Sequence, residues 1–244
     1  MESHVSIPRF DGIESRMSNR FANVDGRSAE GKGMTEHSMQ QKLMTEFIGT
    51  FFLALTICTA AVHGSAGSNA PFAIAATLMV MIYAGGHISG AHYNPAVTIS
   101  IYLRGACHKS DIAPYIATQL VAGVLAAVVS GRLLMLDPVV TEAELELVPT
   151  LAAEFLFTFA LAFVILNVAT SEATEGNGYY GAAIAFVVLA GALTVDSISL
   201  ASFNPAVTAS LVTAGKMTLA DSWMHFAPQL AAGALAACAF KTTQ

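Results

Sequence analysis

Apolar side chains along this 244-residue chain gather into six long runs that shorter polar segments separate. The runs cover about residues 43–63, 71–90, 112–134, 151–170, 179–197 and 222–240. Each run approaches the ~20 residues that a helix needs to cross ~30 Å of hydrocarbon. None carries the polar stripe of helical period that the helices of a soluble bundle show. The pattern therefore predicts an all-α membrane protein.

The composition supports lipid as the surrounding solvent. Hydrophobic residues make up 55% of the chain and charged residues only 11%, against about 25% charged in a typical soluble domain. The net charge is −6 and the acidic residues are scattered, so there is no basic footprint for nucleic acid. We expect membrane lipid, and no nucleic acid, among the partners.

The first 40 residues differ from the rest. They mix Ser, Gly, Asn and charged residues without apolar periodicity, which predicts a disordered tail over 1–40. A membrane domain then covers 41–241. If the tail is cytoplasmic, nine Lys and Arg residues lie on the inner side and only Arg132 and Lys216 on the outer side. This bias favours cytoplasmic N- and C-termini, in a plasma or vacuolar membrane.

The membrane domain repeats itself. Asn94-Pro95-Ala96-Val97-Thr98 returns as Asn204-Pro205-Ala206-Val207-Thr208, 110 positions later. Repeat one covers about 43–134 and repeat two about 151–240. Each half holds three spans, an odd number, so the second half must enter the membrane from the opposite side. This is an inverted-topology repeat.

Each repeated motif predicts the start of a short helix. Asn is a favoured N-cap and Pro a favoured first helical residue. The apolar runs that follow end near Gly105 and Gly215, which leaves about ten residues, or ~15 Å of helix, half a bilayer. Two such half-helices would enter from opposite sides and meet N-terminus to N-terminus near the midplane.

This meeting point has a specific chemistry. The residues before each Asn are not helical, and lipid cannot satisfy their carbonyls, so they must line water. We expect a ladder of carbonyl acceptors at Gly90, Ala91, His92 and Tyr93 and at Leu200, Ala201, Ser202 and Phe203. The two helix N-termini put positive partial charge at the centre, where cations and hydronium are repelled. The amides of Asn94 and Asn204 would donate hydrogen bonds to a passing water, which interrupts a proton wire.

These features resemble the aquaporin, or major intrinsic protein, family over about residues 42–240. The paired Asn-Pro-Ala motifs, the lead-in Gly86-His87-Ile88-Ser89-Gly90 and a Glu in the first span of each half carry the resemblance. It implies an hourglass of six membrane-spanning helices plus two re-entrant half-helices, with one pore per subunit in a homotetramer. It also implies a channel that needs no cofactor, not an enzyme. Glu46 and Glu154 match buried glutamates that hold the re-entrant loops, and His87 is expected at the pore or in its support.

The resemblance also locates a selectivity filter near the outer mouth. Counting from the motifs gives Ile74, Ala192, Ala201 and Val207, although a one-residue gap would bring in a neighbour such as Leu193. Water-specific members of the family have Phe, His, a small residue and Arg at these positions. This apolar set is more similar to the plant tonoplast group. We therefore expect passage of water together with ammonia, urea, hydrogen peroxide or glycerol.

Two other functions stay open at this point. A glycerol or polyol facilitator fits the open filter. Against it, this chain lacks the Asp that usually follows the second motif in such facilitators. A coupled small-solute transporter would need ionisable residues inside the spans, and only Glu46 and Glu154 qualify. No Ser/His/Asp arrangement indicates an enzyme. His87 and His92 lack partner ligands for a metal. His92 could instead respond to pH. The three cysteines are widely spaced, which indicates neither a disulfide framework nor a zinc site.

Overall fold

The computed structural model describes residues 37–244, and every regular element in that part of the chain is a helix. Six helices are long: α2 (Met39–Ile57), α3 (Ala70–Ser89), α5 (Lys109–Val129), α6 (Leu147–Thr170), α7 (Tyr180–Ser199) and α9 (Trp223–Thr243). Two are short: α4 (Pro95–Arg104) and α8 (Pro205–Thr213). The predicted class, six long helices plus two half-helices, is confirmed. The remaining turns are η1 (Cys58–Val62), η2 (Gly67–Asn69), η3 (Ser130–Leu134) and η4 (Glu172–Thr174).

Five helical segments of the described chain are long and apolar enough to cross a membrane. They are Met39–Val62, Gly67–Ser89, Lys109–Leu134, Leu147–Thr170 and Tyr180–Ser199. Helix α9 has the length, with 21 residues, but His225, Gln229 and Lys241 make it less apolar. We count it as the sixth spanning helix, since it occupies in repeat two the place that α5 occupies in repeat one.

The predicted tail overlaps the first helix by two residues. Most of residues 1–40 lie outside the described part of the chain, but α2 begins at Met39. Ser38 and Gln41 form a capping box: Gln41 N–H donates to Ser38 Oγ at 3.3 Å, and Ser38 N–H donates to Gln41 Oε1 at 2.8 Å. Because this box fixes the first turn, the helix starts before the apolar run that the sequence pattern detects.

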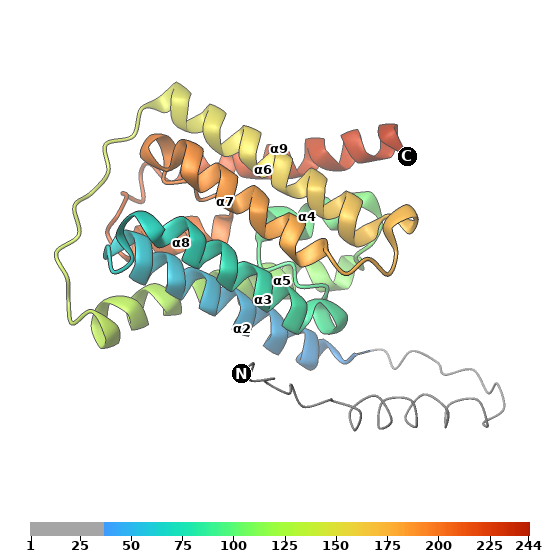
Figure 1. Ribbon diagram of the computed structural model, residues 1–244, viewed down its shortest axis with the longest axis horizontal. Coiled ribbons are helices and arrows are strands. Elements are labelled where there is room, and N and C mark those ends of the chain that lie inside the picture. Colours follow the sequence, from blue (N-terminus) through green and yellow to red (C-terminus); the bar gives the residue numbers. More distant parts are fainter. Residues whose placement is uncertain (1–36) are drawn as a thin grey trace, which may run out of the picture. The chain divides into compact units, whose positions relative to one another are not determined.

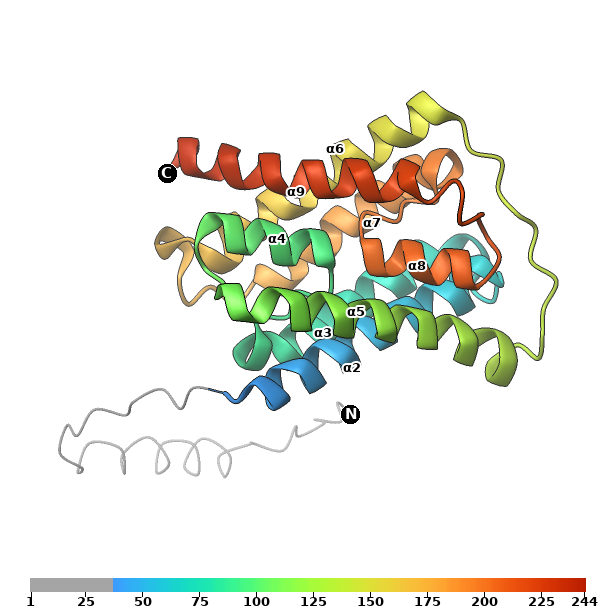
Figure 2. The ribbon, with the colours of Figure 1, turned by 180° about the vertical axis from the view of Figure 1, so that it is seen from behind.

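The two repeats exchange their half-helices. Within each repeat the first long helix packs on the second and third, α2 on α3 and α5, and α6 on α7 and α9. Between repeats, α4 packs on α9 while α8 packs on α5, and the half-helices face each other between the long helices (Figure 2). Gly123 and Gly233 permit these contacts, because a Cβ at either one would overlap a carbonyl oxygen, of Ala206 or Ala96 respectively.

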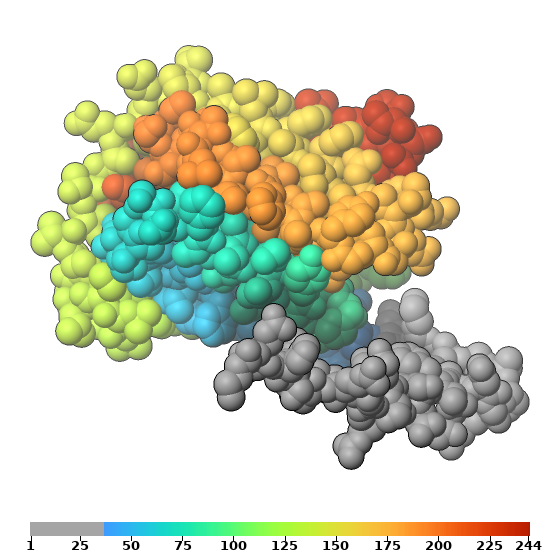
Figure 3. All heavy atoms as spheres, in the orientation of Figure 1, coloured from blue at the N-terminus to red at the C-terminus, as the bar shows by residue number. Residues whose placement is uncertain are grey.

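The described helices run between two ends of the bundle. The start of α2 and the end of α9 lie at the same end, whereas the long 135–146 connection crosses the opposite end (Figures 1 and 2). Large apolar side chains stay exposed on the sides of the bundle, for example Phe72 on α3, Leu156 on α6 and Phe186 on α7. Figure 3 shows the face that these three helices form. Such a belt is the surface expected against lipid or a neighbouring subunit.

Candidate transmembrane pore

The two motif asparagines tie the half-helices together at their N-termini. Asn94 Oδ1 accepts from Ala96 N–H at 2.9 Å, and Asn204 Oδ1 accepts from Ala206 N–H at 2.9 Å, so each Asn caps its own helix. Asn94 Nδ2 donates to the carbonyl of Phe203, and Asn204 Nδ2 donates to the carbonyl of Tyr93, both at 2.9 Å. An amide has two N–H donors. One is therefore used across the repeat boundary, and one remains on each Asn.

The first re-entrant loop is held by one buried carboxylate. Glu46, on α2, is fully buried. Its Oε1 accepts from Ser89 Oγ at 2.7 Å and from His92 N–H at 2.9 Å. Its Oε2 accepts from Tyr93 N–H at 2.7 Å and from Gln119 Nε2 at 2.8 Å. Four donors satisfy the carboxylate, which is the condition for burying it.

Repeat two builds the same arrangement around Glu154, on α6, which is also fully buried. Its Oε1 accepts from Ser199 Oγ at 2.8 Å and from Ser202 N–H at 2.9 Å. Its Oε2 accepts from Phe203 N–H at 2.8 Å and from Gln229 Nε2 at 2.7 Å. Both carboxylates thus bind two consecutive backbone N–H groups of a loop and one Gln of the third long helix.

These bonds hold an unusual backbone. Positive φ angles occur at the same three positions of both loops, namely Gly90, Ala91 and Tyr93, and Leu200, Ala201 and Phe203. A non-glycine residue in this region costs roughly 1–3 kcal/mol and persists only where its surroundings fix it. Here the buried carboxylates fix it. The result is an extended, non-helical segment whose carbonyls do not bond within a helix.

Seven of the eight predicted ladder positions line the central cavity, and Phe203 does not. Its ring stacks on Phe157, 5.3 Å between centroids, and its carbonyl accepts from Asn94. The Tyr93 carbonyl likewise accepts from Asn204. The residue immediately before each Asn lies where the two repeats meet. Its carbonyl therefore accepts a hydrogen bond from the Asn of the opposite motif.

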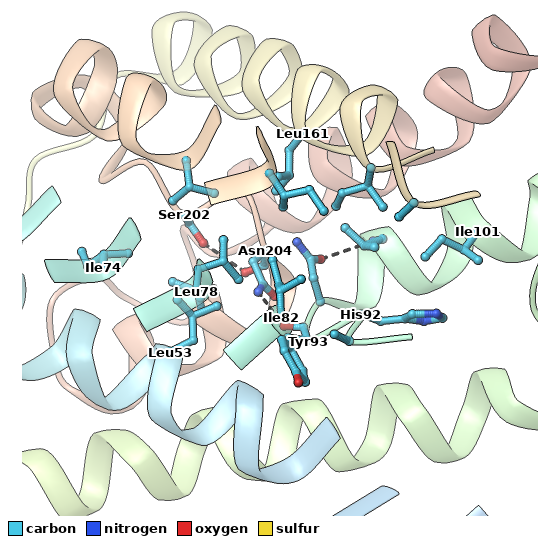
Figure 4. A pocket seen from close by; sticks show the side chains of 18 of the residues that line it. Leu53, Ile74, Leu78, Ile82, His92, Tyr93, Ile101, Leu161, Ser202 and Asn204 are labelled. Carbon is cyan, nitrogen blue, oxygen red and sulfur yellow. Dashed lines mark hydrogen bonds between the residues drawn. The ribbon is translucent and has the colours of Figure 1, made fainter. Parts of the chain in front are cut away.

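One cavity of about 1080 Å³ is lined by residues from both ends of the bundle. Leu53, Leu78 and Ile82 form an apolar wall in its middle, and Leu161 and Ile165 contribute from the other repeat. In Figure 4, Asn204 lies between Ile74 on one side and His92 and Ile101 on the other. One wall of the cavity is therefore apolar, and the re-entrant loops supply the polar groups.

All four counted filter positions lie on the lining of this cavity. Ile74 comes from α3, Ala192 from α7, Ala201 from the second loop and Val207 from α8. None of these side chains carries a hydrogen-bond donor or a charge. Leu193, the neighbour that a one-residue gap would bring in, is 57% exposed and does not line the cavity, whereas Ala192 does.

Two predicted histidines lie toward the end of the bundle where α2 begins. His87 lines the cavity and meets the ring of His37 edge to face, with 6.5 Å between centroids. His92 is buried, its Nδ1 lies 3.2 Å from Thr98 Oγ1, and its ring meets Tyr115 at 5.1 Å. Over residues 37–244, no group of three or more His, Cys, Asp or Glu side chains is placed to hold a metal.

Charged residues line both ends of the cavity, although none was predicted to line it from the sequence. Arg104 lines the cavity at the end of the bundle where α9 ends, and its Nε donates to Thr170 Oγ1 at 2.9 Å and its Nη2 to the Thr170 carbonyl at 2.7 Å. At the opposite end, the cavity is lined by Glu144, Asp196 and Lys216, and Lys216 Nζ donates to the Thr141 carbonyl at 3.1 Å. Cations are favoured at the C-terminal end of a helix, so the position of Arg104 at the end of α4 could have been predicted. No comparable sequence pattern indicates the contact of Lys216 with a loop.

The cysteines carry no visible chemistry. Cys58, Cys107 and Cys238 are all free thiols. Cys107 lies between α4 and α5, where burial raises the pKa of its thiol and the Asp111 carboxylate acts in the same direction. The thiol is therefore protonated at neutral pH, which makes it a poor nucleophile.

Together, the fold and the site define an inverted-repeat helical membrane protein in which two half-helices meet at an internal cavity. Residues 34–195 match the family model described as major intrinsic protein. The chain belongs to the major intrinsic protein family. The match ends before the second Asn-Pro-Ala motif, so the assignment of that motif rests on the internal repeat.

Curated relatives agree with this assignment. The chain is 35% identical over 181 residues to Aquaporin NIP1-1 of Arabidopsis thaliana, covering 68% of this chain and 61% of that protein. It is 38% identical over 177 residues to a probable aquaporin of NIP type from Nicotiana alata, covering 68% and 64%. The alignments thus span about three-fifths of these relatives. Both carry NIP names, so they do not support the resemblance to the tonoplast group.

A solved structure shares the fold. The aquaglyceroporin from Plasmodium falciparum superposes with a TM-score of 0.68, covering 84% of this chain and 95% of that chain, at 20% identity. At that identity the likeness is one of fold. It places the six long helices and two half-helices of this chain in an architecture that has been solved experimentally.

Proposed function

We propose that the chain is a passive transmembrane channel for water and small neutral solutes that excludes protons and ions. One observation carries the proposal. Asn94 and Asn204 cap two opposed half-helices beside a cavity that residues from both ends of the bundle line. Each amide uses one N–H across the repeat boundary, and the second can donate to a solute oxygen in the cavity.

The lining supports a path for neutral polar molecules. Carbonyls of the two loops accept hydrogen bonds from a solute, while the opposite, apolar wall offers none, so a solute forms few bonds and leaves easily. At the centre, the N-termini of α4 and α8 each carry roughly half a positive charge, which opposes cations and hydronium. A water that accepts from both Asn amides has its lone pairs occupied and cannot receive a proton from its neighbour.

The apolar filter sets the proposed solute range. Ile74, Ala192, Ala201 and Val207 offer neither the bulk nor the fixed cation of a narrow water filter. We therefore assign ammonia, urea, hydrogen peroxide and glycerol to the range together with water. A dedicated glycerol or polyol facilitator is the second candidate, supported by the same four side chains. Glycerol passing much faster than water would favour it.

A coupled transporter is less well supported. It needs a carboxylate that can exchange protons with the solute path. Glu46 and Glu154 are fully buried, and four donors occupy each of them. Proton uptake would break bonds that hold the re-entrant loops, so a support role fits these residues better than a relay.

The remaining assignments extend this proposal. Residues 41–241 form the channel domain, with both termini cytoplasmic in the plasma or vacuolar membrane. The exposed apolar sides of the bundle support contact with lipid and assembly into a homotetramer, with one pore per subunit. Cross-linking of the purified protein, read by size, tests the tetramer.

The test of function is solute flux. Purified protein in lipid vesicles is exposed to osmotic gradients of sucrose, urea or glycerol, and volume change is followed by light scattering in a stopped-flow instrument. Water, urea and glycerol rates above those of empty vesicles support the proposal. Water flux alone would overturn the wide solute range, and no flux above empty vesicles would overturn the channel itself.

A further inference from the structure

The two repeats support their loops with different side chains at one equivalent position. Tyr115 on α5 and His225 on α9 are 110 positions apart, as are the two motifs. Tyr115 Oη donates to the Ser89 carbonyl at 2.9 Å. His225 Nε2 lies 2.7 Å from the Ser199 carbonyl. Each ring therefore contacts the carbonyl of the last residue of the helix that precedes a re-entrant loop.

That carbonyl needs an outside donor. The last carbonyls of a helix have no partner in the helix itself, and α3 and α7 end at Ser89 and Ser199. Both ends are buried within the bundle, away from water. Tyr115 and His225 supply the missing donors. A carbonyl only accepts, so its contact assigns the His225 proton to Nε2.

His225 makes this contact at a cost. Its side chain is fully buried, and Nδ1 has no hydrogen-bond partner. Its Nε2 also lies 3.7 Å from Glu154 Oε1, beyond hydrogen-bond distance. A phenylalanine or leucine in this apolar helix would avoid an unsatisfied nitrogen. The contact with the Ser199 carbonyl is thus the one hydrogen bond that the His225 side chain makes at this place.

The location gives this donor a consequence that Tyr115 does not share. Ala201, two residues after Ser199, is a proposed filter position, and its backbone has a φ of 44°. Ser199 Oγ accepts from Ala201 N–H at 3.3 Å. The equivalent loop of repeat one, after Ser89, carries Ala91, which is not one of the four filter positions. Fixing Ser199 therefore fixes one wall of the filter.

We propose that His225 is a positioning residue for solute selectivity: its Nε2–H holds the Ser199 carbonyl and so sets the distance of Ala201 from Ile74, Ala192 and Val207. This inference rests on the proposed channel function. It predicts that loss of the donor alters which solutes pass, in addition to any loss of stability.

Four proteins in vesicles test the inference: wild type, His225→Phe, His225→Tyr and Tyr115→Phe. The readout is the ratio of urea to water permeability, with the melting temperature of each purified protein measured separately. His225→Phe keeps a ring and removes the donor, and we expect its ratio to change by about threefold or more, as the loss of one buried hydrogen bond would give. His225→Tyr restores an O–H donor and is expected to retain the wild-type ratio.

Tyr115→Phe is the matched control. It removes the equivalent bond in repeat one, so we expect a lower melting temperature with an unchanged ratio. An unchanged ratio in His225→Phe, or the same change in Tyr115→Phe, would overturn the inference. If His225→Phe does not accumulate, His225→Tyr decides alone, and an altered ratio in that variant counts against the proposal. Wild-type vesicles without flux would instead reject the channel function, so the two failures are distinguishable.

Discussion

At the scale of single residues, Val207 is the filter position at which the proposed solute range can be tested most directly. It is 2% exposed, it follows the second Asn-Pro-Ala, and its side chain faces the cavity that Ile74, Ala192 and Ala201 also line. Its counterpart Val97 is equally buried but lies at the other end of the inverted repeat. Identical residues in the two motifs therefore have different proposed roles, because only the second copy contributes to the proposed filter.

The substitution Val207→Arg should narrow the pore. A guanidinium in the cavity adds bulk, five donors and a fixed positive charge, so we expect urea and glycerol permeability to fall about tenfold while water still passes. Val207→Leu is the control, since it adds volume without charge. Stopped-flow rates for the three solutes measure the effect. Unchanged urea and glycerol rates in Val207→Arg would remove Val207 from the filter.

The two buried glutamates should prove necessary for the loops. In Glu154→Gln an N–H₂ group replaces one oxygen, so at least one buried donor of the second loop loses its acceptor. We expect a loss of about 1–3 kcal/mol in the free energy of unfolding, measured as a lower melting temperature in detergent. Glu46→Gln should behave alike. The exposed Glu142→Gln is the control, and equal melting of Glu154→Gln and Glu142→Gln would contradict the support role.

At the scale of elements, the sequence predicted more of the half-helices than of their surroundings. Asn before Pro, a run of about ten residues and a closing Gly were enough to predict α4 and α8. The start of α2 was placed too late, because a capping box of polar residues precedes its apolar face. Phe203 was assigned to the ladder because it belongs to the non-helical segment before Asn204. Its ring packs beside Phe157 and its carbonyl accepts from Asn94, and these contacts depend on how the two repeats pair in the fold.

The contact between half-helices and long helices depends on two glycines. Gly123→Ala would place a Cβ against the Ala206 carbonyl oxygen of α8. Because that oxygen belongs to a backbone, it cannot turn aside, and α5 and α8 must separate. We expect a cost of about 1–3 kcal/mol and reduced water permeability. Gly131→Ala, where a Cβ meets nothing within 4 Å, is the control, and a Gly123→Ala protein as stable and permeable as this control would contradict the packing.

At the scale of the whole molecule, the inverted repeat explains why one motif would not suffice. A single half-helix covers only one side of the membrane and leaves its N-terminus without a partner. The cross-bonds from Asn94 to Phe203 and from Asn204 to Tyr93 join two copies into one barrier. The fold and the family were predictable because they depend on repeated residues. The position of Lys216 at one end of the cavity was not predictable, since its contact with the Thr141 carbonyl depends on how two loops fold together.

The proposed channel should pass neutral solutes and stop protons where the two half-helices meet. The most direct measurement uses vesicles that hold purified protein and a trapped pH-sensitive dye, with urea and water flux recorded by light scattering on the same preparation. We predict rapid water and urea flux, with a proton leak no faster than that of empty vesicles under an imposed pH gradient. Proton flux that rises with the amount of protein, in step with solute entry, would contradict it.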